Sequence, residues 1–309
     1  MVQKNNINKK IIVICGPTAS SKTALSVALA KKLDGEIISA DSMNVYKGLD
    51  VGTAKPTIEE REGIAHYLID VVSPFETFSV GDYKELARPV VNDILNRGKT
   101  PIICGGTGFY VNSILYDFSY GNTPANLDVR EKYKALAKER GNAYVFNVLK
   151  EKDPKTAEKL HENDLKRVIR ALEICESGIN KSEIKDEMIP VYDYNAYYID
   201  FPREVLYDRI NRRVDIMVEN GLVDEIKGLI AQGVNANHQC MQGIGYKEIL
   251  PYLSGETDLQ TAIDQIKLNT RHYAKRQLTF FKKLDGLTAL TPDNLENLTK
   301  KIITDLTEK

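Results

Sequence analysis

The chain has 309 residues, of which 42% are hydrophobic and 28% charged, and its formal net charge is −1. This composition is typical of a globular protein with one large or two ordinary domains, and the near-zero charge excludes a global attraction to nucleic acid. Runs of about 18 apolar residues are missing, and the polar first ten residues lack the apolar core of a signal peptide. We therefore expect no membrane span and a cytoplasmic location. The four cysteines and four histidines form no zinc or disulfide pattern.

The first expected element is a buried strand that runs into a phosphate-binding loop. Ile11–Ile14 is an apolar, β-branched run, and a helix is expected over about 24–33. Between them lie Gly16, Pro17, Thr18, Ala19, Ser20, Ser21, Lys22 and Thr23. Loop amides and the positive helix end can hold a phosphate or diphosphate, Lys22 adds a charge, and the Thr23 hydroxyl is a candidate Mg²⁺ ligand. The pattern G-x-x-x-x-G-K-[ST] has glycine where this chain has Ser21, which weakens a generic nucleotide-binding interpretation. A coincidental turn is the alternative.

Strand-like runs then alternate with helices. Strands are expected at Glu36–Ala40, Tyr67–Val72 and Pro101–Cys104, with a helix at about 81–96 between the last two. This alternation predicts an α/β fold with a parallel sheet flanked by helices.

Polar side chains follow two of these strands. Asp41 comes directly after the second strand, and Thr107 lies in the glycine-rich segment Cys104–Tyr110. Because ligands of open α/β sheets bind at the carboxyl ends of the strands, both residues are expected to share a rim with the phosphate loop. Asp41 is then a general base or a carboxylate associated with Mg²⁺, or alternatively a cap of a turn or helix. Thr107 offers a hydroxyl, caps a helix, or does both. The glycines beside it would let the backbone approach a ligand closely.

The segment 116–189 has a mainly helical pattern, and strand-like residues return only at Ala196–Phe201. We expect a helical insertion over 116–189 and a catalytic core formed by 1–115 and 190–309. Helices dominate the second part of that core, which ends with a short strand at Leu287–Leu290 and a last helix.

Three groups of basic residues could form local patches. The first shares one helix face in the insertion and consists of Lys166, Arg167 and Arg170. The second lies in the acid-free segment 265–283, where Lys267, Arg271 and Lys275 repeat every four residues; RNA phosphate binding and a solvated face are equally favoured. The third could close over a phosphate or pair with nearby acids, and consists of Arg203, Arg209, Arg212 and Arg213.

Taken together, these segments resemble the tRNA dimethylallyltransferases, also called tRNA isopentenyltransferases. Besides the phosphate loop, the resemblance is carried in the family's order by Asp41–Tyr46, Gly52–Pro56, Gly105–Tyr110, Asp153-Pro154, Arg167–Glu173, Gly243–Glu248 and Thr270–Gln277. It spans nearly the whole chain. The departures are Ser21 for the usual glycine, Met43-Asn44, Tyr67 where a second histidine is common, and Phe280-Phe281-Lys282 for Trp-Phe-Arg.

The resemblance implies a P-loop-kinase-like fold whose helical insertion grips tRNA. It implies transfer of a dimethylallyl group from dimethylallyl diphosphate to the N6 amine of adenosine 37, next to the anticodon. Residues 16–23 would bind the diphosphate with Lys22 and Mg²⁺, Asp41 would act as the base, and Thr107 would assist at the target nucleotide. The implied contacts to the tRNA anticodon stem-loop are Asp41, Ser42, Met43, Asn44, Thr107, Arg130, Lys166, Arg167, Arg170, Gln242, Gly243, Ile244, Gly245, Tyr246 and Lys247. The basic pattern of segment 265–283 adds Arg271 and Lys275 as expected tRNA contacts. We expect a monomer.

Three other functions are compatible with parts of the pattern. An adenylate isopentenyltransferase would prenylate free nucleotides, but the helical insertion and the basic residues would then lack a role. A small-molecule P-loop kinase would use ATP, which Ser21 disfavours. An RNA-binding protein without catalysis is disfavoured because Lys22, Thr23, Asp41 and Thr107 are all present.

Overall fold

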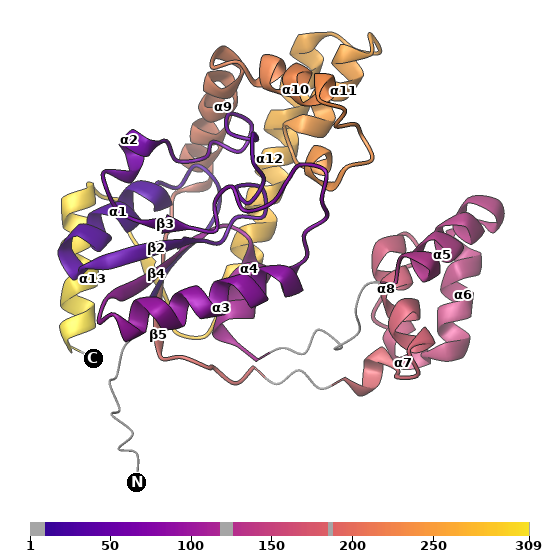
Figure 1. The fold of residues 1–309 in the computed structure, drawn as a ribbon, viewed down its shortest axis with the longest axis horizontal. Coiled ribbons are helices and arrows are strands. Elements are labelled where there is room, and N and C mark those ends of the chain that lie inside the picture. The colour runs from indigo at the N-terminus through magenta and orange to yellow at the C-terminus, as the bar shows by residue number, and fades with distance from the viewer. Residues whose placement is uncertain (1–9, 118–125, 185–187, 309) are drawn as a thin grey trace. The chain divides into compact units, whose positions relative to one another are not determined.

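The computed structural model describes residues 10–117, 126–184 and 188–308. The chain forms two compact units (Figure 1). The first combines Met1–Tyr116 with Pro190–Lys309, and the second is Asp117–Ile189. Among the described residues, no helix combines the length and the apolar character that a membrane crossing requires.

The first unit is built on a parallel sheet whose strand order is β3-β2-β4-β1-β5-β6 (Figure 1). The strands are β1 (Ile11–Cys15), β2 (Gly35–Ser39), β3 (His66–Tyr67), β4 (Thr100–Gly105), β5 (Tyr194–Ile199) and β6 (Leu287–Leu290). Val13 pairs with Ile103 of β4 on one side and with Ala196 of β5 on the other. The predicted parallel α/β fold is confirmed.

Helices cover both faces of this sheet, which explains why its central strands are continuously apolar. The helices of this unit, not all of which lie on the sheet, are α1 (Lys22–Leu33), α2 (Ile58–Arg61), α3 (Val80–Asn96), α4 (Gly108–Leu115), α9 (Arg203–Glu219), α10 (Leu222–Ala231), α11 (Tyr246–Leu253), α12 (Leu259–Phe281) and α13 (Leu295–Glu308). A short 3₁₀ turn spans Gln239–Gln242. Leu25 and Leu29 of α1 pack with Ile12, Ile102 and Leu298 in the main core, while α3 lies against β2 and β4.

One expected strand is much shorter than predicted. The run Tyr67–Val72 was expected to be extended, but β3 ends at Tyr67. Leu68 (φ 61°) and Asp70 (φ 57°) have left-handed backbone conformations, which cannot continue a ladder. Val72 keeps only an isolated bridge to Tyr46. The other predicted strands lie within two residues of their observed bounds.

The second unit is helical: α5 (Leu127–Arg140), α6 (Asn142–Lys152), α7 (Pro154–Ala157), α8 (Leu165–Glu176) and a 3₁₀ turn at Lys181–Glu183. Its core contains Tyr133, Val145, Leu149, Val168 and Leu172. Asp153 caps α7 by accepting a hydrogen bond from the Thr156 N–H (3.1 Å), and its other oxygen accepts one from the Ser182 N–H (3.0 Å). The Asp153-Pro154 pair is therefore a structural joint of this unit.

Candidate active site at the carboxyl edge of the sheet

Three loops meet at the carboxyl edge of the sheet because they follow three neighbouring strands. The phosphate loop follows β1, the segment Ala40–Asn44 follows β2, and Gly106-Thr107 follows β4. The Thr107 N–H donates to the Ala40 carbonyl (3.0 Å), so two of the loops are directly tied together. The structure thus brings Asp41 and Thr107 to the same rim as Lys22.

The phosphate loop contains two residues other than glycine with left-handed backbone. Ala19 has φ 62° and Ser21 has φ 61°, whereas Gly16 adopts φ 127° without strain. Each left-handed non-glycine residue costs on the order of 1–3 kcal/mol. This explains why glycine is usual at the position of Ser21, and it shows that serine keeps the left-handed turn before α1.

Lys22 opens α1 and folds back over the loop. Its Nζ donates to the Pro17 carbonyl (2.5 Å). Burial lowers the pKa of Lys22 to about 8, the nearby Arg213 lowers it as well, and the carboxylate of Asp41 partly offsets them. An anion bound at this loop would stabilise the charged form of Lys22, because opposite charges favour ionisation.

Asp41 caps the turn that follows β2. Its Oδ1 accepts hydrogen bonds from the backbone N–H of Met43 (2.9 Å) and of Asn44 (3.4 Å). The capping interpretation is therefore correct as far as Oδ1 is concerned. Since both bonds go to Oδ1, the second oxygen, Oδ2, can accept a proton from a substrate.

Thr107 occupies the N-cap position of α4 without acting as a side-chain cap. Its Oγ1 accepts from the Ser42 N–H (3.0 Å) and donates to the Ser42 Oγ (3.2 Å). Thr107 is therefore the N-cap residue, as one interpretation has it, but its hydroxyl fixes the loop that carries Asp41 instead of capping the helix.

Two further side chains complete an electrostatic cluster: Arg213, whose role the sequence left undecided, and Tyr273, which the sequence did not single out as a site residue. Arg213 of α9 is close enough to Asp41 and Lys22 to interact with both, and burial lowers its pKa. Burial and then the charge of Asp41 raise the pKa of Tyr273 on α12 to about 12, while a hydrogen bond with Thr107 acts in the opposite direction. The edge of the sheet thus gathers two cations, one carboxylate and one phenol.

Gln277 links the phosphate loop to the loop after β4. Its Oε1 accepts from the Thr18 N–H (3.1 Å), and its Nε2 donates to the Gly106 carbonyl (2.8 Å). Its side chain is buried. The Thr18 amide is therefore occupied within the protein, so the expectation that all of residues 16–23 are open to a diphosphate needs this correction. The sequence could have indicated that Tyr273 and Gln277 face the same site, because residues four apart lie on the same face of a helix.

The glycines of the third loop permit close packing of the protein itself. A Cβ on Gly105 would lie 2.2 Å from the Ala40 carbonyl oxygen, and one on Gly106 would lie 2.2 Å from Gln277 Nε2. A Cβ on Gly108 would meet Phe280 at the same distance. These glycines are therefore needed for close packing within the protein, and their approach to a ligand stays a prediction.

The segment Gln242–Lys247 lies against the loops after β2. The side chain of Met43 packs directly on Gly243, and Gly52 lies against the Tyr246 ring. Glu225 of α10 accepts hydrogen bonds from the Tyr246 hydroxyl (2.7 Å) and from three successive N–H groups of residues 50–52 (2.6–3.0 Å). Gln242 and Lys247 are exposed, whereas Gly245 and Tyr246 are buried. The buried pair supports the fold, which corrects the expectation that the whole segment touches tRNA directly.

The basic residues differ in how much of their charge is free. In the second unit, Arg130 forms a two-point ion pair with the buried Glu173 (2.9 and 3.0 Å), and Arg170 binds the same carboxylate (2.5 Å). Lys166 and Arg167 are exposed. The Arg130 pair holds α5 against α8, and the Arg170 pair lies within α8, so both arginines already neutralise the buried Glu173.

The three basic residues that repeat every four residues on α12, Lys267, Arg271 and Lys275, also differ in whether their charge is paired. We call them the positive stripe. Lys267 forms an ion pair with Asp215 of α9 (2.5 Å), and Arg271 donates to the Asn211 side chain (2.7 Å). Lys275 is exposed. Two members of the stripe therefore join α12 to α9, and binding of tRNA by Arg271 and Lys275 stays a prediction.

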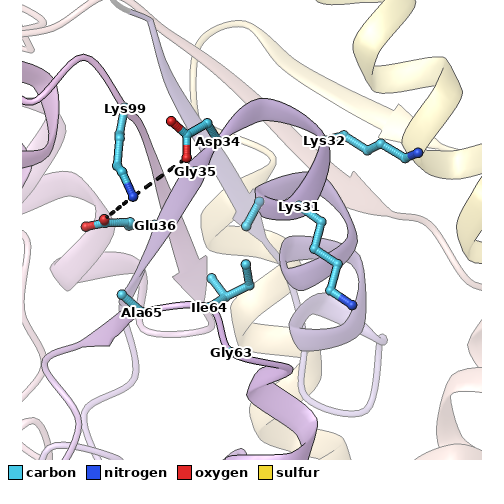
Figure 2. A pocket seen from close by; sticks show the side chains of 10 residues that line it. Lys31, Lys32, Asp34, Gly35, Glu36, Gly63, Ile64, Ala65 and Lys99 are labelled. Carbon is cyan, nitrogen blue, oxygen red and sulfur yellow. Dashed lines mark ion pairs between the residues drawn. The ribbon is translucent and has the colours of Figure 1, made fainter.

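A cavity of about 440 Å³ lies at the opposite edge of the sheet (Figure 2). It is lined by residues around the starts of β2 and β4, among them Gly35 and Lys99, and Lys99 forms ion pairs with Glu36 (2.9 Å) and Asp34 (3.6 Å). This cavity therefore lies at the amino ends of the strands. Ligands of open α/β sheets bind at the carboxyl ends, so the cavity is not the candidate site.

Comparisons with known proteins extend over nearly the whole chain. A family model described as IPP transferase matches residues 44–284. The chain is 48% identical over 300 residues to the tRNA dimethylallyltransferase of Acetivibrio thermocellus, covering 96% of each protein. It is 44% identical over 305 residues to that of Alkaliphilus oremlandii, covering 97% of each.

Solved structures show the same likeness. The tRNA isopentenylpyrophosphate transferase of Bacillus halodurans matches with a TM-score of 0.72, at 43% identity and 97% coverage of both chains. A eukaryotic dimethylallyltransferase acting on tRNA matches with a TM-score of 0.82 at 32% identity, covering 97% of this chain and 80% of that one. The similarity therefore includes both units.

Proposed function

This chain belongs to the tRNA dimethylallyltransferase family, and we infer that it transfers a dimethylallyl group to the N6 amine of adenosine 37 in tRNA. It is a prenyltransferase. We propose that the donor is dimethylallyl diphosphate and that the reaction takes place at the carboxyl edge of the sheet. The observation that carries this proposal is that the phosphate loop, the loop that holds Asp41 and the loop that holds Thr107 follow three neighbouring strands and meet at one end of the sheet.

The reaction needs one bond to break and one to form. The allylic C–O bond of the donor breaks, the diphosphate leaves with the electron pair, and a C–N bond forms to the adenine amine. Negative charge therefore grows on the diphosphate in the transition state. Free loop amides, Lys22 and Arg213 would stabilise that charge, and fixed donors in a site with little water do so efficiently. No phosphoryl group is transferred.

The adenine amine loses a proton as the C–N bond forms. Asp41 Oδ2 would accept this proton, while Oδ1 remains bound to the N–H groups of Met43 and Asn44. The hydrogen bonds of Thr107 to Ser42 would hold this loop in place. The target base must leave its stack, and this costs less free energy in a loop than in a duplex. An anticodon loop is therefore a favourable substrate.

We propose that a Mg²⁺ ion would be held jointly by this chain and the substrate. The described residues contain no group of three or more His, Cys, Asp or Glu side chains that could hold a metal. The Thr23 hydroxyl is a suitable oxygen ligand, and Mg²⁺ commonly combines one or two protein oxygens with waters and substrate phosphates. When bound there, the ion would neutralise charge on the departing diphosphate.

The direct test is incubation of the purified chain with dimethylallyl diphosphate, Mg²⁺ and unmodified tRNA, followed by mass analysis of the nucleosides. We expect a prenylated adenosine at position 37. Parallel reactions with AMP and with ATP test the adenylate isopentenyltransferase and the kinase. Prenylation of AMP in preference to tRNA, or ATP turnover without prenyl transfer, would contradict the proposal. The monomeric state and the cytoplasmic location also stay predictions.

A further inference from the structure

Arg209 of α9 is hydrogen-bonded to both left-handed, non-glycine residues of the phosphate loop. Its Nε donates to the Ala19 carbonyl (2.8 Å), and one terminal nitrogen donates to the Ser21 Oγ (2.6 Å). The guanidinium also lies over the Phe201 ring, 4.8 Å from its centroid. Arg209 is thus fixed by an aromatic face and holds two strained points of the loop at once.

The same helix supports the loop through apolar packing. Ala19 is buried in a cluster with Leu206 and Ile210 of α9 and Ala274 of α12. A left-handed alanine is unfavourable in a free chain, so this packing and the bond from Arg209 together stabilise its conformation. The support of the loop therefore comes largely from α9, which begins at Arg203, far from the loop in the sequence.

Ser21 depends on Arg209 more than a glycine would. A glycine adopts φ near 60° without steric cost but has no side chain with which to bind Arg209. Serine is strained at φ 61°, and its hydroxyl accepts a short hydrogen bond from a charged donor. The bond and the strain occur at one residue, so the first can compensate for the second.

We propose that Arg209 is a positioning residue that holds the phosphate loop in the shape that receives the diphosphate, and that its bond to Ser21 compensates for the missing glycine. The inference rests on the proposed binding of diphosphate by this loop. The opposing possibility is that Arg209 contacts the diphosphate directly. The two differ in one measurable respect, because only the positioning role makes the effect of Arg209 depend on the residue at position 21.

The experiment measures binding of inorganic diphosphate with Mg²⁺ to the full chain by calorimetry. Ser21→Ala keeps the strain and loses the bond, so we expect about tenfold weaker binding. Ser21→Gly loses both, so we expect binding within about threefold of the wild type. Arg209→Gln should weaken binding about tenfold in the serine background and by no more than about threefold in the glycine background.

A matched control is Lys227→Gln, which removes an exposed cation from the neighbouring helix α10 and should leave binding unchanged. In prenyl-transfer assays, Arg209→Gln should raise KM for the donor with little change in kcat. Thermal unfolding shows whether Arg209→Gln is folded. If it is not, the comparison of Ser21→Ala with Ser21→Gly still tests whether the bond to Ser21 supports binding.

Equal binding by Ser21→Ala and Ser21→Gly would overturn the inference. An equal loss from Arg209→Gln in both backgrounds would also overturn it and would indicate direct contact with the diphosphate. If the wild type does not bind inorganic diphosphate with Mg²⁺, both the proposed function and this inference are overturned. The two failures are therefore distinguishable.

Discussion

At the scale of single residues, one substitution can separate the turn cap that Asp41 forms from the proton transfer that we propose for it. Oδ1 caps a turn and Oδ2 would accept the substrate proton. Asp41→Asn keeps an oxygen acceptor for the Met43 N–H but is not a base. We therefore expect turnover of tRNA to fall by about 100-fold or more, with diphosphate affinity within about threefold of the wild type. Single-turnover kinetics and calorimetry measure the two quantities.

Asp41→Ala is the comparison, because it removes the cap as well as the base. If Asp41→Asn turns over like the wild type while Asp41→Ala is inactive, the carboxylate only shapes the loop. In that case another group must accept the proton.

The pKa of Lys22 predicts how the affinity for diphosphate depends on pH. Burial and Arg213 lower this pKa to about 8, so the ammonium is charged below pH 8 and loses its proton above it. A bound diphosphate favours the charged form and raises the pKa. Affinity for diphosphate should therefore fall by up to about tenfold per pH unit above 8.

Lys22→Met is the control for this profile, since it is measured with the same ligand and cancels the ionisation of the diphosphate itself. The ratio of wild-type to Lys22→Met affinity, from calorimetry between pH 7 and 9.5, should decrease above pH 8. A constant ratio over this range would exclude Lys22 as the titrating group.

At the scale of elements, the end of β4 packs so closely against the loop after β2 that it leaves no room for a side chain at Gly105. A Cβ on Gly105 would lie 2.2 Å from the Ala40 carbonyl oxygen, which is backbone and cannot rotate away. We expect Gly105→Ala to destabilise the chain by about 3 kcal/mol and to displace Asp41. Denaturant unfolding and prenyl-transfer activity should both report the loss.

Gly228→Ala is the matched control. Gly228 lies on an exposed part of α10, and a Cβ there would have no heavy atom within 4 Å. Because alanine is the better helix former, the chain should gain up to about 1 kcal/mol. Equal stability of the two variants would show that the loop after β2 can move away from β4 at little cost.

The elements also show what the sequence could and could not predict. Ile11–Ile14 and Lys22 identified the central strand and the loop, because burial on both faces leaves a continuous apolar run. Leu68 ended β3 early, since no local pattern signals a left-handed leucine. Arg213 was left undecided because an arginine on a helix reveals its spacing but not the helix that packs beside it. The roles of Gln277 and Arg209 depend on contacts between residues far apart in the chain, which periodicity does not report.

At the scale of the whole molecule, the basic residues divide into charges that hold the chain together and charges that lie exposed at the surface. Arg167 belongs to the exposed class, with a surface ion pair to Asp164 (3.8 Å). Lys267 and Arg271 join α12 to α9, and Arg130 and Arg170 bind the buried Glu173. A charge already paired inside the protein releases few counterions when RNA binds. Sequence clustering alone therefore overestimates the number of phosphate contacts.

The salt dependence of tRNA binding tests this division. Each lost phosphate contact to single-stranded RNA lowers the slope of log K against log salt by about 0.7, so replacing the exposed Lys166 and Arg167 by alanine should lower it by about 1.4. Replacing Lys267 and Arg271 should change the slope less and lower thermal stability instead. The control is a double alanine variant of Lys32 and Lys301, two exposed lysines on α1 and α13. An unchanged slope without Lys166 and Arg167, or a full decrease without Lys267 and Arg271, would show that RNA contacts follow sequence clusters and not exposed charge.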